Sequence, residues 1–224
     1  MTTTARMLPE PEQHTASVAH GPDTVGSRAA FRAVRCGDGL DRCPWAVATA
    51  GALEDHDHHW GSAPANAQGH FAALVLELVD SGLARWSQSA RHPAWYLHLA
   101  DLRPERVATF DEDDIDDLMV NADLIRNRAK LEAVVHNAEV CRDWDVAEWT
   151  ALLEEAEVPP CGPPPGNALD LPDTTAAARR LSQVLRSRGI VLVGPVSAHR
   201  WLQRTGRAPG HVAGCFRAGV PATL

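Results

Sequence analysis

The chain has 224 residues, of which 45% are hydrophobic, and it carries a formal net charge of −8 with a sequence pI of about 5.7. A chain of this length can bury one sizeable core, so we expect one domain with a tail rather than two domains. The acidic balance excludes broad electrostatic attraction to nucleic acid, so any such contact has to come from a local basic surface.

The sequence predicts a cytoplasmic protein with no membrane partner. No apolar run approaches the ~20 residues that a membrane span needs, and residues 1–6 lack the apolar core of a signal peptide. In a reducing compartment we expect three of the five cysteines, Cys36, Cys141 and Cys161, to be free thiols rather than disulfide partners.

The domain organisation follows from composition along the chain. Residues 1–38 contain scattered Pro, Gly, Thr, Ser and His without helical or strand periodicity, which predicts a disordered tail. Residues 39–220 are predicted to form a single domain, followed by a short tail at 221–224. Within the domain, the apolar stretch 71–79 predicts a buried helix, and Pro104 predicts the first turn of a short one.

Two helices joined by a hairpin are predicted next. Residues 111–114 give an acidic first turn, which is favourable at the positive end of a helix. Apolar residues then follow at helical spacing in both helices: Ile115, Leu118 and Met119, then Leu131, Val134, Val135 and Ala138. The connection between them, residues 121–127, is short enough for an antiparallel hairpin.

The last third of the chain begins with a proline-rich loop at residues 158–167. Thr174 or Thr175 is expected to cap a helix that ends at Gly189, and a last helix over 198–205 is expected to stop at Gly206. The apolar segment 190–194 is too short and isolated for a sheet, so the predicted fold class is all-α.

Four residues from the two ends of the domain form a candidate metal site. They are Cys43 and His56 near the start and His211 and Cys215 near the end. Two cysteines and two histidines suit tetrahedral zinc, and a closed four-ligand shell is structural rather than catalytic. The alternative is that these are ordinary core residues, which the paired spacing disfavours.

Six stretches of the chain, taken in order between about Asp41 and Arg217, resemble one family. They are Cys43 to Trp45; His56 and Asp57 with Trp60 and Gly61; Leu76 and Glu77 with Gly82 and Leu83; residues 124–131 with Asn137 and Ala138; Arg188 and Gly189 with Val193 and Gly194; and residues 211–215. Together they are similar to DNA-3-methyladenine glycosylase I, a zinc-containing family of the helix-hairpin-helix superfamily.

The resemblance implies what the protein is expected to do. The family hydrolyses the N-glycosidic bond of N3- or N7-alkylated purines in double-stranded DNA, and the damaged nucleotide has to be flipped out of the stack for this. A helix-hairpin-helix fold, a structural Zn²⁺ that joins the N- and C-terminal segments, and a monomer are implied as well.

Carried over by position, the resemblance also implies site residues. Cys43, His56, His211 and Cys215 match the zinc ligands. Glu77 matches the catalytic carboxylate that hydrogen-bonds the base, with Asp80 on the same helix face, while Trp45 and Leu83 match the base pocket. The residues that match DNA-backbone contacts in or after the hairpin are Arg126, Asn127, Arg128 and Lys130.

Several positions depart from the family pattern. Asp55 stands where a tyrosine is typical, Arg85 where a tryptophan is expected, and the sole tyrosine, Tyr96, lies elsewhere. Loss of these rings predicts a wider pocket that holds a small base weakly, because base stacking on an aromatic ring contributes roughly 1–3 kcal/mol. We therefore expect specificity for bulkier adducts, with Asp55 facing a cationic purine and Arg85 bonding an oxygenated adduct, and self-resistance to a DNA-alkylating natural product as one use.

Other interpretations stay open at this point. Glu77 can be a structural acid that pairs with a buried donor, and Arg85 a solvated residue. Three further arginines, Arg200, Arg204 and Arg207, either extend a basic face or pair with acids. A non-catalytic DNA-damage-binding protein on the same fold is the alternative function, and a zinc-stabilised helical protein without a nucleic-acid role is a third.

The only lysine of the chain, Lys130, is also its only side-chain candidate for a Schiff base. Because the resemblance places it outside the base pocket, we expect a monofunctional enzyme.

Overall fold

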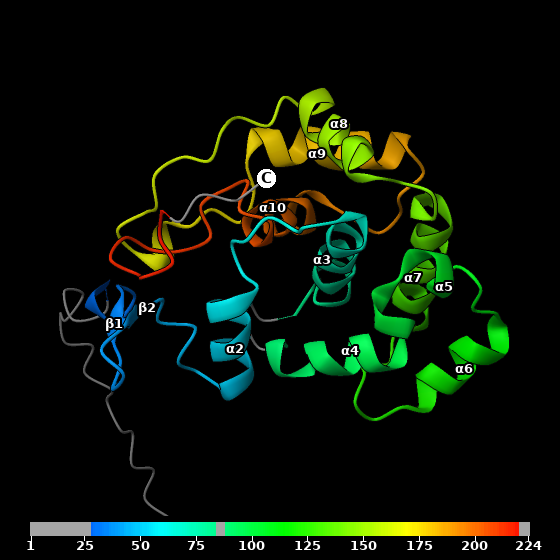
Figure 1. Cartoon of the computed structure of the whole chain (residues 1–224), viewed down its shortest axis with the longest axis horizontal. Coiled ribbons are helices and arrows are strands. Elements are labelled where there is room, and N and C mark those ends of the chain that lie inside the picture. Colours follow the sequence, from blue (N-terminus) through cyan, green and yellow to red (C-terminus); the bar gives the residue numbers. More distant parts are fainter. Residues whose placement is uncertain (1–27, 84–87, 220–224) are drawn as a thin grey trace, which may run out of the picture.

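Helices account for most of the regular structure in the computed structural model, which describes residues 28–83 and 88–219 (Figure 1). The α-helices are α2 (Ala50–His58), α3 (Ala67–Val79), α4 (His92–His98), α5 (Pro104–Val107), α6 (Glu112–Val120), α7 (Arg128–Cys141), α8 (Val146–Glu155), α9 (Ala176–Ser187) and α10 (Pro195–Arg204). Short 3-10 helices are η1 (Ser89–Arg91), η2 (Ala100–Leu102) and η3 (Ala168–Asp170). The prediction of a helical fold is confirmed.

Helix α3 forms the centre of the core. Every residue of its segment 70–79 is buried, so the helix is packed on all sides rather than along one stripe. It contacts α10, α7, α8 and η2, and Figure 1 shows it between α10 and α7. The carboxylates of Glu77 and Asp80 therefore lie in or next to the buried core, where an ionised group needs a hydrogen-bond or ion-pair partner.

The predicted hairpin lies between α6 and α7, which contact each other. Asp111 caps α6 through a capping box with Asp114, and Asn127 caps α7 by accepting a hydrogen bond from the backbone N–H of Lys130 at 3.2 Å. Leu124, at the hairpin tip, is 3% exposed and fixes the hairpin to the core.

Helices α9 and α10 form an adjacent pair above α3 in Figure 1. Thr175 caps α9, and Gly189, with a φ of +91°, follows its end in the left-handed conformation that favours glycine. Helix α10 begins at Pro195, three residues before the predicted start, because proline is well suited to the first turn. Its last residue is Arg204.

The N-terminal segment contains structure that the sequence did not predict. Strands β1 (Val34–Arg35) and β2 (Asp41–Arg42) pair antiparallel, with Val34 opposite Arg42. The guanidinium of Arg28 also pairs with Asp170 at 2.6 Å. Regular structure therefore begins before residue 38, so that part of the predicted tail is wrong, whereas residues 1–27 and 220–224 lie outside the described residues.

All five cysteines lie in the described part of the chain, and none of them forms a disulfide. Among the helices described, none is both long and apolar enough to span a bilayer.

Candidate metal centre and base cavity

The four predicted metal ligands meet in one buried cluster. Their ligand atoms all lie within 4.8 Å of one another. The Sγ atom of Cys215 is 3.3 Å from Nε2 of His56 and 3.8 Å from Nδ1 of His211, while Sγ of Cys43 is 3.6 Å from Nδ1 of His211. A tetrahedral site with bonds of about 2.0–2.3 Å has edges of roughly 3.3–3.8 Å, so this donor set fits a tetrahedral metal ion.

Hydrogen bonds orient both histidines toward the centre of the cluster. Nδ1 of His56 lies 2.7 Å from Oδ1 of Asp57, and Nε2 of His211 lies 3.1 Å from the carbonyl oxygen of Trp60. Each contact requires a proton on the outer ring nitrogen, which leaves the inner nitrogen as a lone-pair donor.

The surroundings of the cluster suit two thiolates and leave little free space. Backbone N–H groups of Val212 and Arg217 donate to Sγ of Cys43 and Cys215, each at 3.4 Å. Gly61 has a φ of +74°, and a Cβ there would lie 2.6 Å from Nε2 of His211. The position therefore requires glycine for conformation and for space.

Trp45 packs beside this cluster. Its ring meets His56 edge-on with centroids 5.0 Å apart and Trp60 at 5.7 Å. It is not among the described residues that line the cavity below. Trp45 therefore packs against the Cys₂His₂ cluster, and its place in the base pocket stays a prediction.

A cavity of about 630 Å³ lies beside the metal centre, between α2, the start of α3 and α4. Many of its lining residues are small, among them Gly51, Ser62, Ala63, Gly69 and Ala73. Tyr96, the sole tyrosine of the chain, also lines it, so the ring that was expected elsewhere is part of this site. Its volume is within the range of small-molecule sites, about 300–1,000 Å³.

Arg204 and Asp55 form the charged part of the cavity wall. The two terminal nitrogens of Arg204 donate to the two oxygens of Asp55 at 2.8 and 3.2 Å, and its Nε–H donates to Oε1 of Glu77 at 2.6 Å. The guanidinium carbon lies 4.9 Å from the ring centroid of Trp60. Arg204 is only 5% exposed, so these contacts hold a buried cation in one orientation.

Glu77 lies behind Arg204. It is 3% exposed and is not among the described residues that line the cavity. Arg204 donates to Oε1 of Glu77. This contact fits the alternative in which Glu77 is a structural acid that pairs with a buried donor. Burial raises the pKa of Glu77, and the nearby charge of Arg204 opposes this change.

Asp55 does line the cavity, as predicted, but its carboxylate already binds Arg204. Burial disfavours its ionised form, yet the charge of Arg204 and the contacts with His92 and Arg204 outweigh burial and hold the pKa of Asp55 well below its usual value. Asp55 is therefore an anion whose charge is paired with that of Arg204.

His92 connects two of the acids. Its Nε2 lies 3.0 Å from Oδ2 of Asp80, and its Nδ1 lies 3.6 Å from Oδ1 of Asp55. Asp80 does not itself line the cavity, whereas His92 does, so Asp80 contributes through His92 and not by direct contact. Burial disfavours charged His92, but the two neighbouring carboxylates outweigh it and raise the pKa of His92.

Two predicted pocket residues have other positions. Leu83 is half-buried and is not among the residues that line the cavity, so its assignment to the pocket edge has no support in this position. Arg85 lies outside the described residues.

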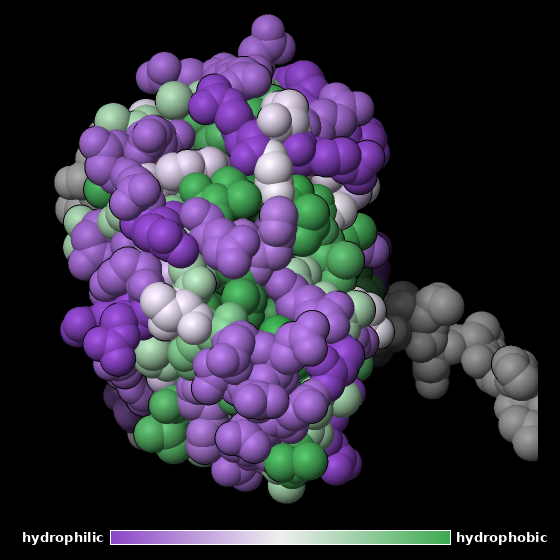
Figure 2. Space-filling view, turned by 90° about the vertical axis from the view of Figure 1, so that its right-hand side faces the viewer, coloured by the Kyte–Doolittle hydropathy of each residue, from purple (hydrophilic) through white to green (hydrophobic). Residues whose placement is uncertain are grey.

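The predicted DNA-binding residues lie at the hairpin but differ in accessibility. Arg126 is exposed, and Asn127 is the cap of α7. Arg128 pairs with Asp116 and lies 3.8 Å from Glu132. Figure 2 shows the face that carries α6 and α7, where hydrophilic side chains cover much of the surface.

Lys130 is not available to a phosphate. It is 8% exposed, and its ammonium donates to the carbonyl oxygens of Val79 and Ser81 at 2.8 and 2.7 Å. Val79 is the last residue of α3 and Ser81 lies two residues after it, where backbone carbonyl oxygens lack helical partners. The predicted DNA contact through Lys130 is therefore corrected to a structural one.

Sequence reasoning did not identify three residues of the cavity: Arg204, His92 and Tyr96. Arg204 had been left as a basic-face or paired residue, and its partner Asp55 is 149 positions away in the sequence. One feature of the sequence indicated that the Arg204 side chain points inward: Arg204 is the last residue of a helix that has one apolar face.

Comparisons with known proteins show which family the chain resembles. Residues 45–218 match the family model described as methyladenine glycosylase. A relative named DNA-3-methyladenine glycosylase, from Haemophilus influenzae, is 27% identical over 186 residues, which cover 78% of this chain and 96% of the relative. DNA-3-methyladenine glycosylase 1 of Escherichia coli is 24% identical over 183 residues, which cover 79% and 96%.

Solved structures give the same result. A crystal structure of 3-methyladenine DNA glycosylase I in complex with 3-methyladenine has a TM-score of 0.68 at 26% identity, covering 78% of this chain and 95% of the other. The Staphylococcus aureus 3-methyladenine DNA glycosylase I also has a TM-score of 0.68 at 26% identity, covering 82% and 96%. Because the family model covers most of the chain, this protein belongs to the methyladenine glycosylase family.

Proposed function

We propose that this chain is a monofunctional DNA glycosylase that hydrolyses the N-glycosidic bond of an alkylated purine in double-stranded DNA. The observation that carries the proposal is the cavity of about 630 Å³, whose wall holds Tyr96 and the pair of Asp55 and Arg204. Membership of the family and the names of its relatives, which are 3-methyladenine glycosylases, support the reaction class.

The chemistry needs little acid assistance. An N3- or N7-alkylated purine carries positive charge and is already a good leaving group, so the enzyme has mainly to extrude and hold it while water attacks the sugar carbon. Tyr96 supplies a ring at the cavity on which a flipped base can stack.

The carboxylates of Asp55, Glu77 and Asp80 determine the charge of the site. They lie around Arg204 and His92, so the group has three acids for two bases. The net charge of this group is therefore not positive, so the site does not repel positive charge on the base or on the sugar. In this proposal Glu77 acts by holding Arg204 and offsetting its charge.

The size of the cavity supports bulkier adducts as substrates. Alanine at positions 63 and 73 leaves space where larger side chains would narrow the cavity around a methylated base. A larger alkyl group recovers contact area that a methyl group cannot. Self-resistance to a DNA-alkylating natural product would be one use of that specificity.

A Schiff-base mechanism has no support in this geometry. Lys130 is the only lysine of the chain, and its ammonium is bound to two carbonyl oxygens away from the cavity lining. Covalent trapping with borohydride on abasic DNA is expected to fail.

The Cys₂His₂ cluster is proposed to hold a structural Zn²⁺. The donor types, their spacing and the orienting hydrogen bonds fit that ion, and four protein ligands leave no position for a reacting water. The ion would join α2 to the segment after α10, which are two sides of the region that carries Asp55 and Arg204.

Mass spectrometry of bases released from alkylated duplex DNA tests the proposal. DNA treated with a series of small and bulky alkylators is incubated with the wild type and with Glu77→Gln. We expect free alkylpurine from the wild type, with larger adducts favoured, and slower release by Glu77→Gln. Binding to damaged DNA without release of any base would instead favour the non-catalytic damage-binding alternative.

A further inference from the structure

The helical segment of residues 89–98, which comprises η1 and α4, presents one face to the cavity. Ser89, His92, Pro93 and Tyr96 line the cavity, and their spacing of three, four and seven residues places them on one side of a helix. Pro93 and Tyr96 are also exposed to solvent, so they lie at the mouth of the cavity. A base that enters the cavity therefore passes this segment.

Another face of the same segment contacts the tip of the hairpin. Nη1 of Arg91 donates to the carbonyl oxygen of Asp123 at 3.4 Å, and Nε2 of His98 lies 3.9 Å from the carboxylate of Asp123. The hairpin is the predicted contact to the DNA backbone, and the cavity is the proposed place of the flipped base. Residues 89–98 therefore lie between the two places at which the protein would hold the damaged strand.

Arg91 is an accessible cation at this position. Its side chain is exposed, and within residues 28–83 and 88–219 no carboxylate lies within ion-pair distance of its guanidinium. The surrounding sequence is free of acids as well, because no Asp or Glu occurs between Asp80 and Asp101 in a chain whose net charge is −8. The bond to Asp123 uses one of five N–H donors, so a phosphate can still be bound through two N–H groups.

We propose that residues 89–98 form a second DNA-contacting element, in which Arg91 binds a phosphate of the damaged strand beside the flipped nucleotide. The proposal rests on the glycosylase function proposed above. A nucleotide that leaves the stack stays bonded to the phosphates on both of its sides, so these anions remain at the cavity mouth while the base is inside. Arg91 is then a positioning residue, which holds the strand and touches no reacting atom.

The test measures binding to a duplex that carries one tetrahydrofuran abasic analogue, which has no base and no glycosidic bond to cleave. In a series of such duplexes, one phosphate at a time is replaced by a neutral methylphosphonate, at the two positions on each side of the analogue in the damaged strand. Fluorescence anisotropy gives the affinities. For the wild type we expect roughly a tenfold loss at one of these positions, because a charge-assisted bond to that phosphate is removed.

Variants then assign that phosphate to Arg91. Arg91→Gln is expected to bind the unmodified duplex roughly tenfold more weakly and to show no further loss with the critical methylphosphonate, since two changes to one contact are not additive. Arg91→Lys keeps the charge without the planar fork and should keep part of the sensitivity. Arg186→Gln, at an exposed arginine of α9 on the far side of α3 from α4 in Figure 1, is the control and should behave as the wild type.

The outcomes separate this inference from the proposed function. If Arg91→Gln keeps the full sensitivity of the wild type at every position, or if the wild type has no sensitive position, Arg91 binds no phosphate there and the inference is overturned. Release of alkylpurine by the wild type would leave the glycosylase function standing in that case. Conversely, coupling between Arg91 and one phosphate without any base release would support the DNA contact and contradict the glycosylase chemistry. Absence of binding to every duplex overturns the inference.

Discussion

Oδ1 of Asp57 lies 2.7 Å from Nδ1 of His56, so a proposed metal ligand and the carboxylate that orients it are adjacent in the sequence. Arg42 is 5% exposed and holds the same carboxylate through Nε and a terminal nitrogen at 3.0 and 2.8 Å. The helix α2 thus carries the ligand and its support, and β2 carries the cation that fixes them.

Asp57→Asn is expected to lower metal affinity by roughly 10–100-fold, because the amide holds the His56 ring and its tautomer less strongly than the carboxylate does. Competition with a chromophoric chelator measures the change. Asp117→Asn, an exposed acid on α6, is the matched control and should bind metal like the wild type. Equal affinity of both variants would show that Asp57 does not support the site.

Removal of one thiolate should separate the structural role of the metal from other roles of cysteine. Cys215→Ser is expected to lower the metal content and the melting temperature, because the ion links segments that are far apart in sequence. Cys161→Ser alters an exposed thiol outside the cluster and should change neither. A Cys215→Ser protein with normal metal content and melting temperature would contradict the cluster as a metal site.

Much of the fold could be predicted because its signals are local. Thr175, one of the two predicted candidates, caps α9, and the apolar spacing of Leu131 and Val134 places one face of α7 in the core. The metal cluster was also predictable, since its residue types restrict the chemistry. Strand β1 was not, because two residues give no periodicity.

The cavity was less predictable because its contacts are not local. The pairing of Arg204 with Asp55 and Glu77 joins α10, α2 and α3, and nothing near Arg204 in the sequence indicates those partners. Lys130 was misassigned for a similar reason: its position after the hairpin suggested DNA, whereas its side chain is long enough to reach the end of α3.

Lys130→Met should reduce the free energy of unfolding by about 1–3 kcal/mol, because two carbonyl oxygens at the end of α3 lose their donor. Chemical denaturation measures this. The salt dependence of DNA binding is expected to stay unchanged, since the ammonium does not reach a phosphate. A variant with full stability and weaker, less salt-dependent binding would return Lys130 to the DNA interface.

His92 predicts a dependence of stability on pH. Its pKa is raised in the folded protein, because the carboxylates of Asp55 and Asp80 outweigh its burial. The resulting stabilisation is fully present below the unfolded pKa of about 6.5 and is lost as the pH rises through the higher folded value. Unfolding in denaturant at several pH values above 6 should therefore show a steeper loss of stability in the wild type than in His92→Gln. Equal slopes would exclude this contribution.

The hairpin cation Arg126 predicts the salt dependence of DNA binding. It is exposed, and among the described residues it has no acid bound to it, unlike Arg128, which pairs with Asp116. Arg126→Glu is expected to weaken binding to all duplexes. It should also lower the slope of log K against log salt by about 0.9 for each phosphate that the protein no longer neutralises. Titrations at several salt concentrations give that slope.

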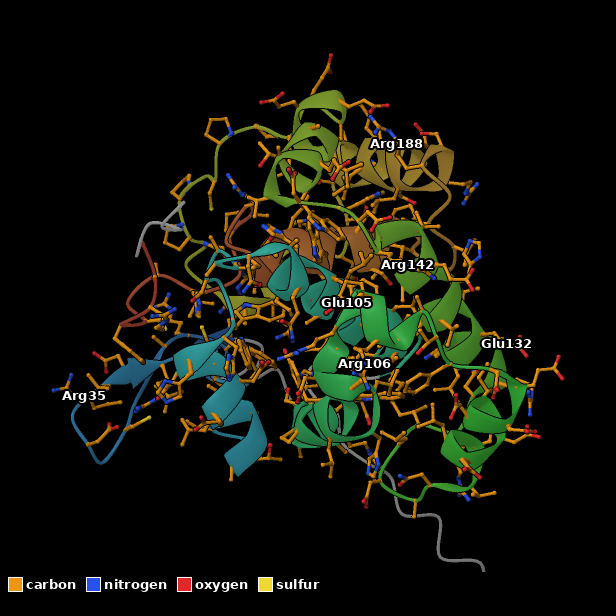
Figure 3. The ribbon with its side chains drawn as sticks, turned by 45° about the vertical axis from the view of Figure 1, so that its right-hand side comes forward. Arg35, Glu105, Arg106, Glu132, Arg142 and Arg188 are labelled. Carbon is orange, nitrogen blue, oxygen red and sulfur yellow. The ribbon has the colours of Figure 1, made fainter. Side chains whose placement is uncertain are left out.

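Arg142→Glu is the matched control, because it makes the same charge change just beyond the other end of α7. Figure 3 shows Arg142 at the end of α7 that is remote from the hairpin, with Glu132 nearer the beginning. The helix has 14 residues and is therefore roughly 20 Å long, which exceeds the screening length of about 10 Å at 0.1 M salt. An equal fall of the slope in both variants would mean that net charge governs binding and that the hairpin does not touch the DNA.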